Sequence, residues 1–494
     1  MRSSGDPVIG KALLQKIRSD FIGIDTPYKN VTGKTTPRIY LDSTASSLML
    51  RPAARITDDF LTHYSNTHSK LHHSAHISTA AYDWAHERIL SFLGADPDIY
   101  TCFFTGAGTT SGINRLARVF RDLQPDKDTA IISIMEHHSN DLPHRKHMRK
   151  VIHVPVTGLN ENKMCISLPE LESALKKGQG RINYVSITAV SNVTGIINPI
   201  HKIARLAHQY GALIMIDGAQ SAAHLPTRLF HAEDPEASID AFVFSGHKTY
   251  TPGSPGVVIA RMDHLSKIEP EEVGGGMVER VLEKRYQVKS EFPDREEAGT
   301  PNIPGAIALA TTIEILDRIG MKTLFKEEDE VLTGALTVMG QIPEITVYGG
   351  TDTEACPRAA SISFNVQGLD HGLVAAILND YFNIAVRNQC FCAHPYVKEM
   401  MSDDLEEVFG IINFGDMSPE FMRKAGMVRA SFGLYSTHQD VEALVAALKD
   451  IIKNGDQYAK QYDINSDNDY IHKTYRLQHD EIFDVKRAVD EYLS

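Results

Sequence analysis

Two polar residues that follow apolar segments could together perform amine chemistry. Lys248 ends the Gly-containing turn 245–248, and a lysine amine in such a turn can form a Schiff base with a carbonyl compound. Asp217 directly follows the apolar residues 213–216, where a carboxylate can keep a pyridine nitrogen protonated. Pyridoxal 5'-phosphate needs both a Schiff-base lysine and a carboxylate partner for its ring nitrogen. The two residues therefore predict a site for that cofactor.

Each residue also has an ordinary explanation. Most lysines are solvated surface residues. Asp217 fits a helix N-cap as well as a buried site, and Gln220 could complete a capping pair or reach the cofactor's phenolic oxygen. In favour of a site at Lys248, the neighbouring Ser245 and His247 can donate hydrogen bonds to a phosphate.

Three further segments follow apolar strands. The Gly-, Thr- and Ser-rich segment 106–112 opens a helical pattern, so Thr109 and Thr110 could bind a phosphate at a helix N-terminus. His137 could stack on the cofactor ring, although a pair of loop histidines explains it equally. Asn192 stands at another strand end, where an Asx turn is the simple alternative.

The other chemical cluster is the segment 390–394, which reads Cys-Phe-Cys-Ala-His. Three interpretations compete: a zinc site, which the lack of a second Cys/His pair at ligand spacing disfavours, a pair of inert core cysteines, and a nucleophilic thiolate. Arg387 nearby could favour a thiolate. Arg429 interrupts an apolar strand pattern and could clamp a substrate carboxylate.

Apolar runs alternate with helical periodicities between about 85 and 310, which predicts a mostly parallel sheet covered by helices on both faces. Ligands bind such sheets at the carboxyl ends of the strands. The expected strands are 99–104, 130–134, 182–187, 212–216, 241–244 and 256–260.

Beyond about 330 the pattern predicts a smaller α+β domain, with strands at 345–348, 360–366, 384–387 and 427–432 and a helix at 440–452. The tail ends in an amphipathic helix that packs on the body or on a partner chain. We therefore predict an N-terminal segment 1–40 that joins the small domain, a large cofactor domain 41–325, a small domain 326–453 and an appended helix 454–494.

Composition narrows the functional classes. The 494 residues are 42% hydrophobic and 23% charged, as in soluble globular proteins of more than one domain. A net charge of −13 argues against nucleic-acid binding, and no apolar run is long enough for a membrane span. Five cysteines make no disulfide framework, and no secretory signal is evident, so we expect a reducing, cytoplasmic location.

The ordered motifs resemble those of class V aminotransferase-fold enzymes, closest to the cysteine desulfurase and selenocysteine lyase branch. The resemblance spans about 38–452 and rests on the motifs at 108–114, 136–138, 191–195, 217–220, 245–248, 298–302, 392–395 and 429–431. It implies fold type I of the pyridoxal phosphate-dependent transferases, an α/β fold with a smaller α+β domain.

The resemblance also implies roles for individual residues. Lys248 carries the cofactor, Asp217 and Gln220 contact its ring, and His137 stacks on it. Asn192, Arg387 and Arg429 bind the substrate, and Cys392 takes its sulfur as a persulfide for transfer to an acceptor protein. The phosphate is held by Thr109, Thr110, Ser245, His247 and, from the other subunit of a homodimer, Thr300. No metal is implied.

This chain departs from the branch at 387–392. The branch carries Arg-x-Gly-His-His-Cys, whereas this chain reads Arg-Asn-Gln-Cys-Phe-Cys, which looks more like molybdenum-cofactor sulfurases. An acidic, Met-rich connector at 400–420 follows. Two alternatives to a desulfurase therefore remain: an aminotransferase, epimerase or other lyase acting on a different amino acid, and a non-enzymatic scaffold that binds partners through the connector and the C-terminal helix.

Overall fold

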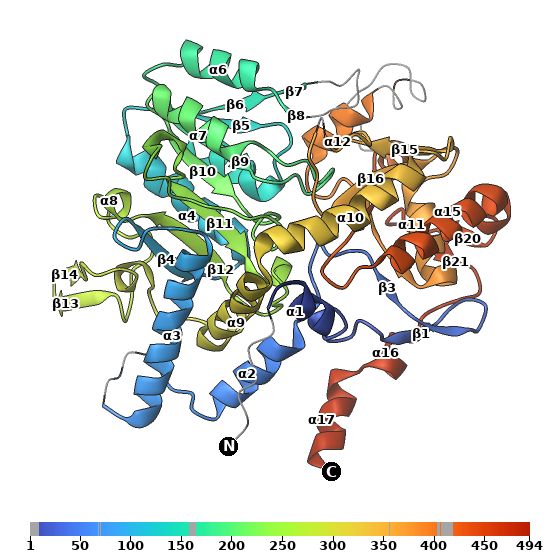
Figure 1. Cartoon of the computed structure of the whole chain (residues 1–494), viewed down its shortest axis with the longest axis horizontal. Coiled ribbons are helices and arrows are strands. Elements are labelled where there is room, and N and C mark those ends of the chain that lie inside the picture. Colours follow the sequence, from blue (N-terminus) through green and yellow to red (C-terminus); the bar gives the residue numbers. More distant parts are fainter. Residues whose placement is uncertain are drawn as a thin grey trace.

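The computed structural model describes residues 9–67, 69, 71–157, 165–354, 356–402, 406 and 418–494. A larger unit built on a seven-stranded sheet lies beside a smaller unit built on a four-stranded sheet (Figure 1). Most of the acidic connector expected at 400–420 lies outside the described residues.

The seven-stranded sheet has the order β4-β12-β11-β10-β9-β5-β6. Strands β11, β10, β9, β5 and β6 are parallel, and β12 is antiparallel to both of its neighbours. The six predicted strands are found within one residue at each end. The bounds are β4 Tyr100–Thr105, β5 Thr129–Ser133, β6 Lys150–Val154, β9 Ile182–Thr188, β10 Leu213–Asp217, β11 Ala241–Ser245 and β12 Gly256–Arg261.

Helices cover both faces of this sheet because successive side chains of a strand point to opposite faces. Phe242 and Phe244 of β11 pack into one core with α3, α6, α7 and α9, while Val243 packs into a second core with α4 and α8. The predicted α/β fold, with helices on both faces, is therefore confirmed. The helices are α2 Arg51–Leu61, α3 His73–Phe92, α4 Gly108–Leu123, α5 Leu142–His147, α6 Leu168–Lys177, α7 Ile200–Gln209, α8 Met262–Leu265 and α9 Ile303–Ile319.

The smaller unit is an antiparallel sheet of order β15-β16-β19-β18, which packs against α10, α11 and α15. Its strands are β15 Ile345–Tyr348, β16 Ser361–Val366, β18 Arg387–Gln389 and β19 Met427–Ser431, and its helices are α10 Met321–Met339, α11 His371–Phe382 and α15 His438–Ala459. The N-terminal strand β3 (Ile39–Tyr40) pairs in parallel with β17 (Ile384–Ala385). The predicted boundaries at 325/326 and 453/454 fall inside α10 and α15, and the domain limits stay a prediction.

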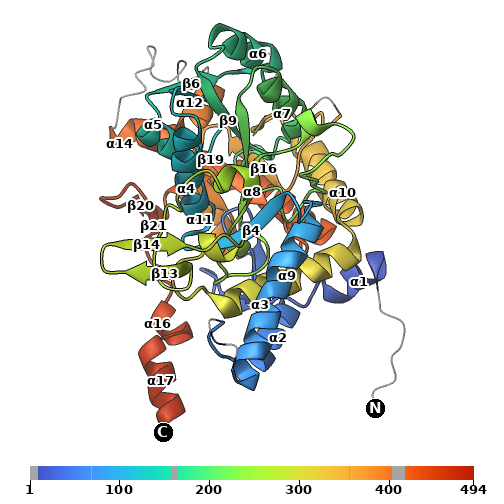
Figure 2. The same cartoon turned by 90° about the vertical axis from the view of Figure 1, so that its left-hand side faces the viewer.

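The C-terminal segment forms a hairpin, β20 (Tyr462–Ile464) with β21 (Tyr470–His472), followed by α16 (His479–Ile482) and α17 (Val485–Leu493). Figure 2 shows α17 projecting from the body. Its apolar side chains are exposed, for example Tyr492 at 89%, so the helix does not pack on the body of its own chain, and the alternative of packing on a partner chain stays a prediction. None of the described helices is both long and apolar enough to cross a bilayer.

The remaining helices and strands are short. They are α1 Gly10–Ile17, β1 Pro27–Lys29, β2 Thr35–Pro37, β7 Val156–Thr157, β8 Cys165–Ile166, β13 Val278–Leu282, β14 Arg285–Val288, α12 His394–Met400 and α14 Pro419–Lys424.

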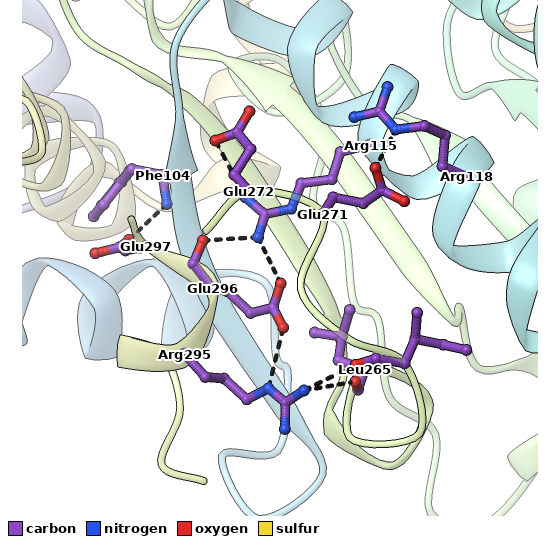
Figure 3. A network of polar contacts seen from close by, with 10 residues as sticks. Phe104, Arg115, Arg118, Leu265, Glu271, Glu272, Arg295, Glu296 and Glu297 are labelled. Atoms are coloured by element: carbon purple, nitrogen blue, oxygen red, sulfur yellow. Dashed lines mark hydrogen bonds and ion pairs between the residues drawn. The ribbon is translucent and has the colours of Figure 1, made fainter. Parts of the chain in front are cut away.

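A buried network of charged residues ties the segment before Thr300 to the larger unit (Figure 3). Arg115 of α4 donates from Nη2 to the Glu296 carboxylate (2.6 Å) and to the Glu296 carbonyl (2.8 Å). Glu297 accepts the backbone N–H of Phe104 in β4 (2.8 Å). Burial raises the pKa of Glu296, although the Arg115 charge opposes it. The network fixes where the chain emerges toward Thr300.

Replacing Arg115 with methionine should lower the free energy of unfolding by about 1.5–3 kcal/mol, because the buried Glu296 carboxylate loses its closest cation and keeps only Arg295 at 3.3 Å. Urea unfolding measures the effect. Arg121→Met is the control, since the exposed Arg121–Asp122 pair is worth about 1 kcal/mol or less. Equal losses in the two variants would contradict the role given to the buried pair.

Candidate active site

A cavity of about 220 Å³ lies where the carboxyl ends of β5, β9, β10 and β11 face the smaller unit. It is lined by twelve of the thirteen residues that the sequence singled out, which are Thr109, Thr110, His137, Asn192, Asp217, Gln220, Ser245, His247, Lys248, Arg387, Cys392 and Arg429. The thirteenth, Thr300, does not line it. Its hydroxyl accepts a hydrogen bond from Asn66 at an exposed position (3.1 Å).

Lys248 reaches the cavity from a single 3₁₀ turn, Gly246–Lys248, directly after β11. A Cβ at Gly246 would lie 1.8 Å from the Ser254 hydroxyl, so only glycine fits this turn. Burial lowers the pKa of Lys248 to about 8, and the charges of Arg429 and Arg387 act in the same direction. About a fifth of the amine is therefore neutral and nucleophilic at pH 7.4, far more than for an ordinary lysine.

Asp217 ends β10, and no helix follows it, which rules out the helix N-cap alternative. Its Oδ1 accepts the backbone N–H of Ala219 (2.9 Å), and burial raises the pKa of this carboxyl. Gln220 completes no capping pair, because its Nε2 donates to the carbonyl of Thr44 (2.9 Å). The Thr44 hydroxyl is buried and has no hydrogen-bond partner among the described residues.

Hydroxyl groups gather at the N-terminus of α4. Ser245 Oγ accepts the backbone N–H of Thr109 and contacts its hydroxyl, both at 2.7 Å. Thr110 Oγ1 lies 2.7 Å from the hydroxyl of Ser139. Gly108 has φ +58°, and a Cβ there would lie 2.5 Å from Ser245 Oγ. Backbone N–H groups and hydroxyls at a helix N-terminus suit a bound anion.

Two histidines line the cavity in their neutral form. Burial, with the Lys248 charge as the next cause, lowers the pKa of His137 to about 3 and that of His247 to about 4. A neutral imidazole can lie flat against an aromatic ring or pass a proton.

Arg429 of β19, a strand of the smaller unit, lines the cavity. Its Nη1 donates to the carbonyl of Asn192 (2.7 Å), and its Nη2 contacts Asp42 Oδ1 (3.3 Å). Its Nε is buried without a hydrogen-bond partner among the described residues. Burial lowers the pKa of Arg429 to about 10, which leaves it charged at neutral pH. A cation with a free buried donor is suited to a carboxylate.

Asn192 forms no Asx turn, because the Ser191 hydroxyl accepts the backbone N–H groups of Val193 and Thr194 instead. The Asn192 amide donates to the carbonyl of Phe391 (2.7 Å) and so holds the cysteine-containing loop.

The two cysteines of this loop have different environments. Cys392 is exposed and lines the cavity. Cys390 is buried against the smaller unit, where its thiol donates to the carbonyl of Ala425 (3.1 Å), and burial raises its pKa to about 11. Among the described residues, no three His, Cys, Asp or Glu side chains are arranged to hold a metal ion.

The sequence missed several contacts. Ser139, Thr44 and Asp42 line or border the site, and only the position of Ser139 just after the His pair hinted at this. Cys165 and Cys356 form a disulfide across 191 residues of sequence, although the sequence predicted no disulfide framework.

Gln389 stands where the resembling branch has glycine, and its φ of +87° is a backbone conformation that favours glycine. Gln389→Gly should raise the free energy of unfolding by about 1 kcal/mol, since the strain removed exceeds the added chain entropy. Urea unfolding measures this. Gln341→Gly, at an exposed residue after α10, should instead lower the stability, and a loss in both variants would contradict strain at Gln389.

Comparison with known proteins agrees with this geometry. The model of the aminotransferase class-V family matches residues 39–444. A probable cysteine desulfurase of Halalkalibacterium halodurans is 34% identical over 84% of this chain and 93% of its own length. A cysteine desulfurase of an Enterobacter species is 31% identical over 89% of this chain and 98% of its own length.

Solved structures give the same assignment. The apo cysteine desulfurase of Thermococcus onnurineus superposes with a TM-score of 0.74 at 27% identity, covering 91% of this chain and all of the other. A cysteine desulfurase of Escherichia coli has a TM-score of 0.70 at 26% identity, covering 89% of this chain and 98% of the other. The chain belongs to the class-V aminotransferase family and, within it, is a cysteine desulfurase-like protein.

Proposed function

We propose that this protein is a pyridoxal phosphate-dependent cysteine desulfurase, which converts L-cysteine to L-alanine and keeps the sulfur on Cys392. One observation carries the proposal: the Lys248 amine, the Arg429 guanidinium and the Cys392 thiol line one cavity. An amine base, a carboxylate anchor and a sulfur nucleophile are the three groups that this reaction needs.

The residues present fit the cofactor. The hydroxyls of Thr109, Thr110 and Ser245 at the N-terminus of α4 would hold its phosphate. Asp217 would accept the ring N–H, and the partnerless Thr44 hydroxyl adds a polar group to the cavity wall. When bound, the cofactor supplies an electron sink for a carbanion at the substrate α-carbon.

The amine of Lys248 gives a test of this fit that does not depend on turnover. Only the neutral amine attacks an aldehyde, so capture of pyridoxal phosphate by the apoprotein should speed up about tenfold per pH unit and level off near pH 8. An ordinary lysine would continue to gain up to about pH 10.4. Stopped-flow absorbance measures the rate, and continued acceleration well above pH 8 would contradict the lowered pKa of Lys248.

The chain's own residues account for the remaining steps. Arg429 would bind the substrate α-carboxylate, with its free Nε as an added donor, and Arg387 lines the same side of the cavity. Lys248 Nζ would take the proton from the substrate α-carbon. His137, neutral at physiological pH, would lie against the cofactor ring.

Cys392 would perform the sulfur step. Its thiolate attacks the substrate sulfur, a sulfur–sulfur bond forms, and the bond between that sulfur and Cβ breaks. The electron pair stays with the substrate and is quenched by a proton at Cβ, Lys248 Nζ then returns a proton to the α-carbon, and the products are alanine and a persulfide on Cys392. Because Cys392 is exposed, an acceptor protein could then take the outer sulfur.

A homodimer is part of the proposal. Thr300 lies outside its own chain's cavity, at an exposed site anchored by the buried network of Figure 3, so it is free to complete a second subunit's phosphate site. We also propose a cytoplasmic location, because Cys102, Cys390 and Cys392 are free thiols, as is usual in a reducing compartment.

Incubation with L-cysteine and a reductant tests the function. We expect equal amounts of alanine and sulfide. Formation of the pyridoxamine form, or turnover of an amino acid other than cysteine without alanine release, would instead favour an aminotransferase, an epimerase or another lyase. A colourless protein that captures no cofactor would favour a scaffold.

A further inference from the structure

Two histidines meet just outside the cavity, behind the cysteine-containing loop. His138 belongs to the 3₁₀ turn η1 (His138–Asn140), and His394 is the first residue of α12. Nδ1 of His394 lies 2.9 Å from Nε2 of His138, and the two rings are stacked with an interplanar angle of 10°. Both rings are at least partly exposed, so neither packs as a core residue.

The cysteine-containing loop that directly precedes His394 is strained. Gln389, Phe391 and Cys392 have φ of +87°, +51° and +56°, although none of them is glycine. Each such residue costs about 1–2 kcal/mol and persists only where surrounding contacts hold it. The orientation of Cys392 therefore depends on contacts made by its neighbours.

His138 makes two of those contacts. Its backbone N–H donates to the carbonyl of Cys392 (2.7 Å), and its ring holds His394 two residues further on. On the other side of the thiol, Asn192 holds the carbonyl of Phe391 (2.7 Å), and the Arg429 guanidinium lies over the Phe391 ring (4.7 Å). Cys392 is thus fixed from both sides, and the side toward α12 is fixed through the histidine pair.

We infer that His138 and His394 form a clasp that positions the Cys392 thiol over the cavity for the sulfur step. Both are positioning residues, because neither lies where it would touch the reacting atoms. The inference rests on the proposed function for its catalytic consequence, but the clasp itself is a property of the loop.

The clasp depends on protonation. A nitrogen–nitrogen hydrogen bond needs one N–H and one lone pair, so it fails once both rings are charged. The groups that face the rings are Asp141 and Arg145 beside His138, and Lys398 beside His394. Burial lowers the pKa of both histidines, and the ring of His138 lowers that of His394 further. The clasp is therefore closed at neutral pH and opens only in acid.

Two substitutions of His394 separate the hydrogen bond from its titration. His394→Asn places an amide where Nδ1 was, so it keeps the bond to His138 without a group that titrates. His394→Leu keeps the bulk and removes the bond. Another histidine pair, His201 and His231, with ring centroids 4.6 Å apart, lies away from the cavity, and His231→Gln is the matched control.

Hydrogen exchange of the peptide 388–398 in the holoenzyme measures the clasp without any turnover. At pH 7.5 we expect about tenfold less protection in His394→Leu than in wild type, and wild-type protection in His394→Asn and His231→Gln. Lowered pKa values keep at least one ring neutral through the ordinary histidine range, so protection corrected for intrinsic exchange should fall in wild type only in stronger acid and show no such fall in His394→Asn. Unchanged protection in His394→Leu at pH 7.5 overturns the clasp.

Single-turnover persulfide formation from L-cysteine, followed by the mass of the same peptide, measures its consequence. We expect His394→Leu to lower the maximal single-turnover rate constant about tenfold with the half-saturating L-cysteine concentration unchanged, because the carboxylate anchor is untouched, and we expect His394→Asn to keep the wild-type rate constant. If wild type forms no persulfide while the exchange results hold, the proposed function fails and the clasp stands. If wild type forms the persulfide but the peptide 388–398 of His394→Leu exchanges like that of wild type, the clasp is refuted and the proposed function stands.

Discussion

Replacing Lys248 with alanine should lower alanine formation from L-cysteine by at least about 10⁴-fold. In the proposed mechanism the substitution removes both the amine that would attach the cofactor and the base that would take the proton from the substrate, and general bases alone contribute up to about 10⁴-fold. Amino-acid analysis of the reaction measures alanine directly.

Lys202→Ala is the control, because Lys202 is an exposed lysine on α7, far from the cavity. It should keep wild-type activity and wild-type absorbance of the bound cofactor. A Lys248→Ala protein that still formed alanine at more than about one hundredth of the wild-type rate would remove this residue from the chemistry.

Replacing Cys392 with serine should abolish persulfide formation and lower alanine release by about 100-fold or more, since a hydroxyl cannot replace a thiolate as the sulfur nucleophile. Binding of L-cysteine should persist, because Lys248 and Arg429 are unchanged. Cofactor absorbance follows binding, and the mass of the peptide 388–398 follows the sulfur.

Cys390→Ser is the matched control within the same loop. The Cys390 thiol is buried and donates a hydrogen bond to the Ala425 carbonyl, and burial raises its pKa to about 11. The thiol is therefore a poor nucleophile. We expect this variant to keep most of the persulfide formation. Equal loss in both variants would mean that the two thiols act in sequence rather than Cys392 alone.

The sequence predicted the larger unit well because its strands are continuous apolar runs that are buried on both faces. The exception was β6, where Lys150 and His153 interrupt the apolar pattern. The tail was predicted less well: α15 continues to Ala459 past the expected end, since Gly455 is buried against Leu369 and does not break the helix.

The cavity-lining residues were predictable for a related reason. Asp217, Lys248 and Asn192 each follow a strand, and the carboxyl ends of parallel strands meet at one edge of a sheet. The contacts of Asp42 and Thr44 were not predictable, because they depend on how a segment near the N-terminus folds back across the sheet. The disulfide between Cys165 and Cys356 was also not predictable, because no local sequence pattern links two residues that are 191 positions apart.

Arg429 belongs to the smaller sheet, and Lys248 follows a strand of the larger one. In the proposed mechanism Arg429 would hold the carboxylate of the amino acid and Lys248 would act at its α-carbon, so the substrate would bridge the smaller and the larger unit. Both contacts are to groups that every amino acid has, so Arg429 and Lys248 alone would not distinguish one amino acid from another. In the proposed mechanism, selection among side chains would therefore depend on the other residues of the cavity wall, among them Phe391 and Cys392 of the cysteine-containing loop, and exchanging that loop is a direct way to test for a changed specificity.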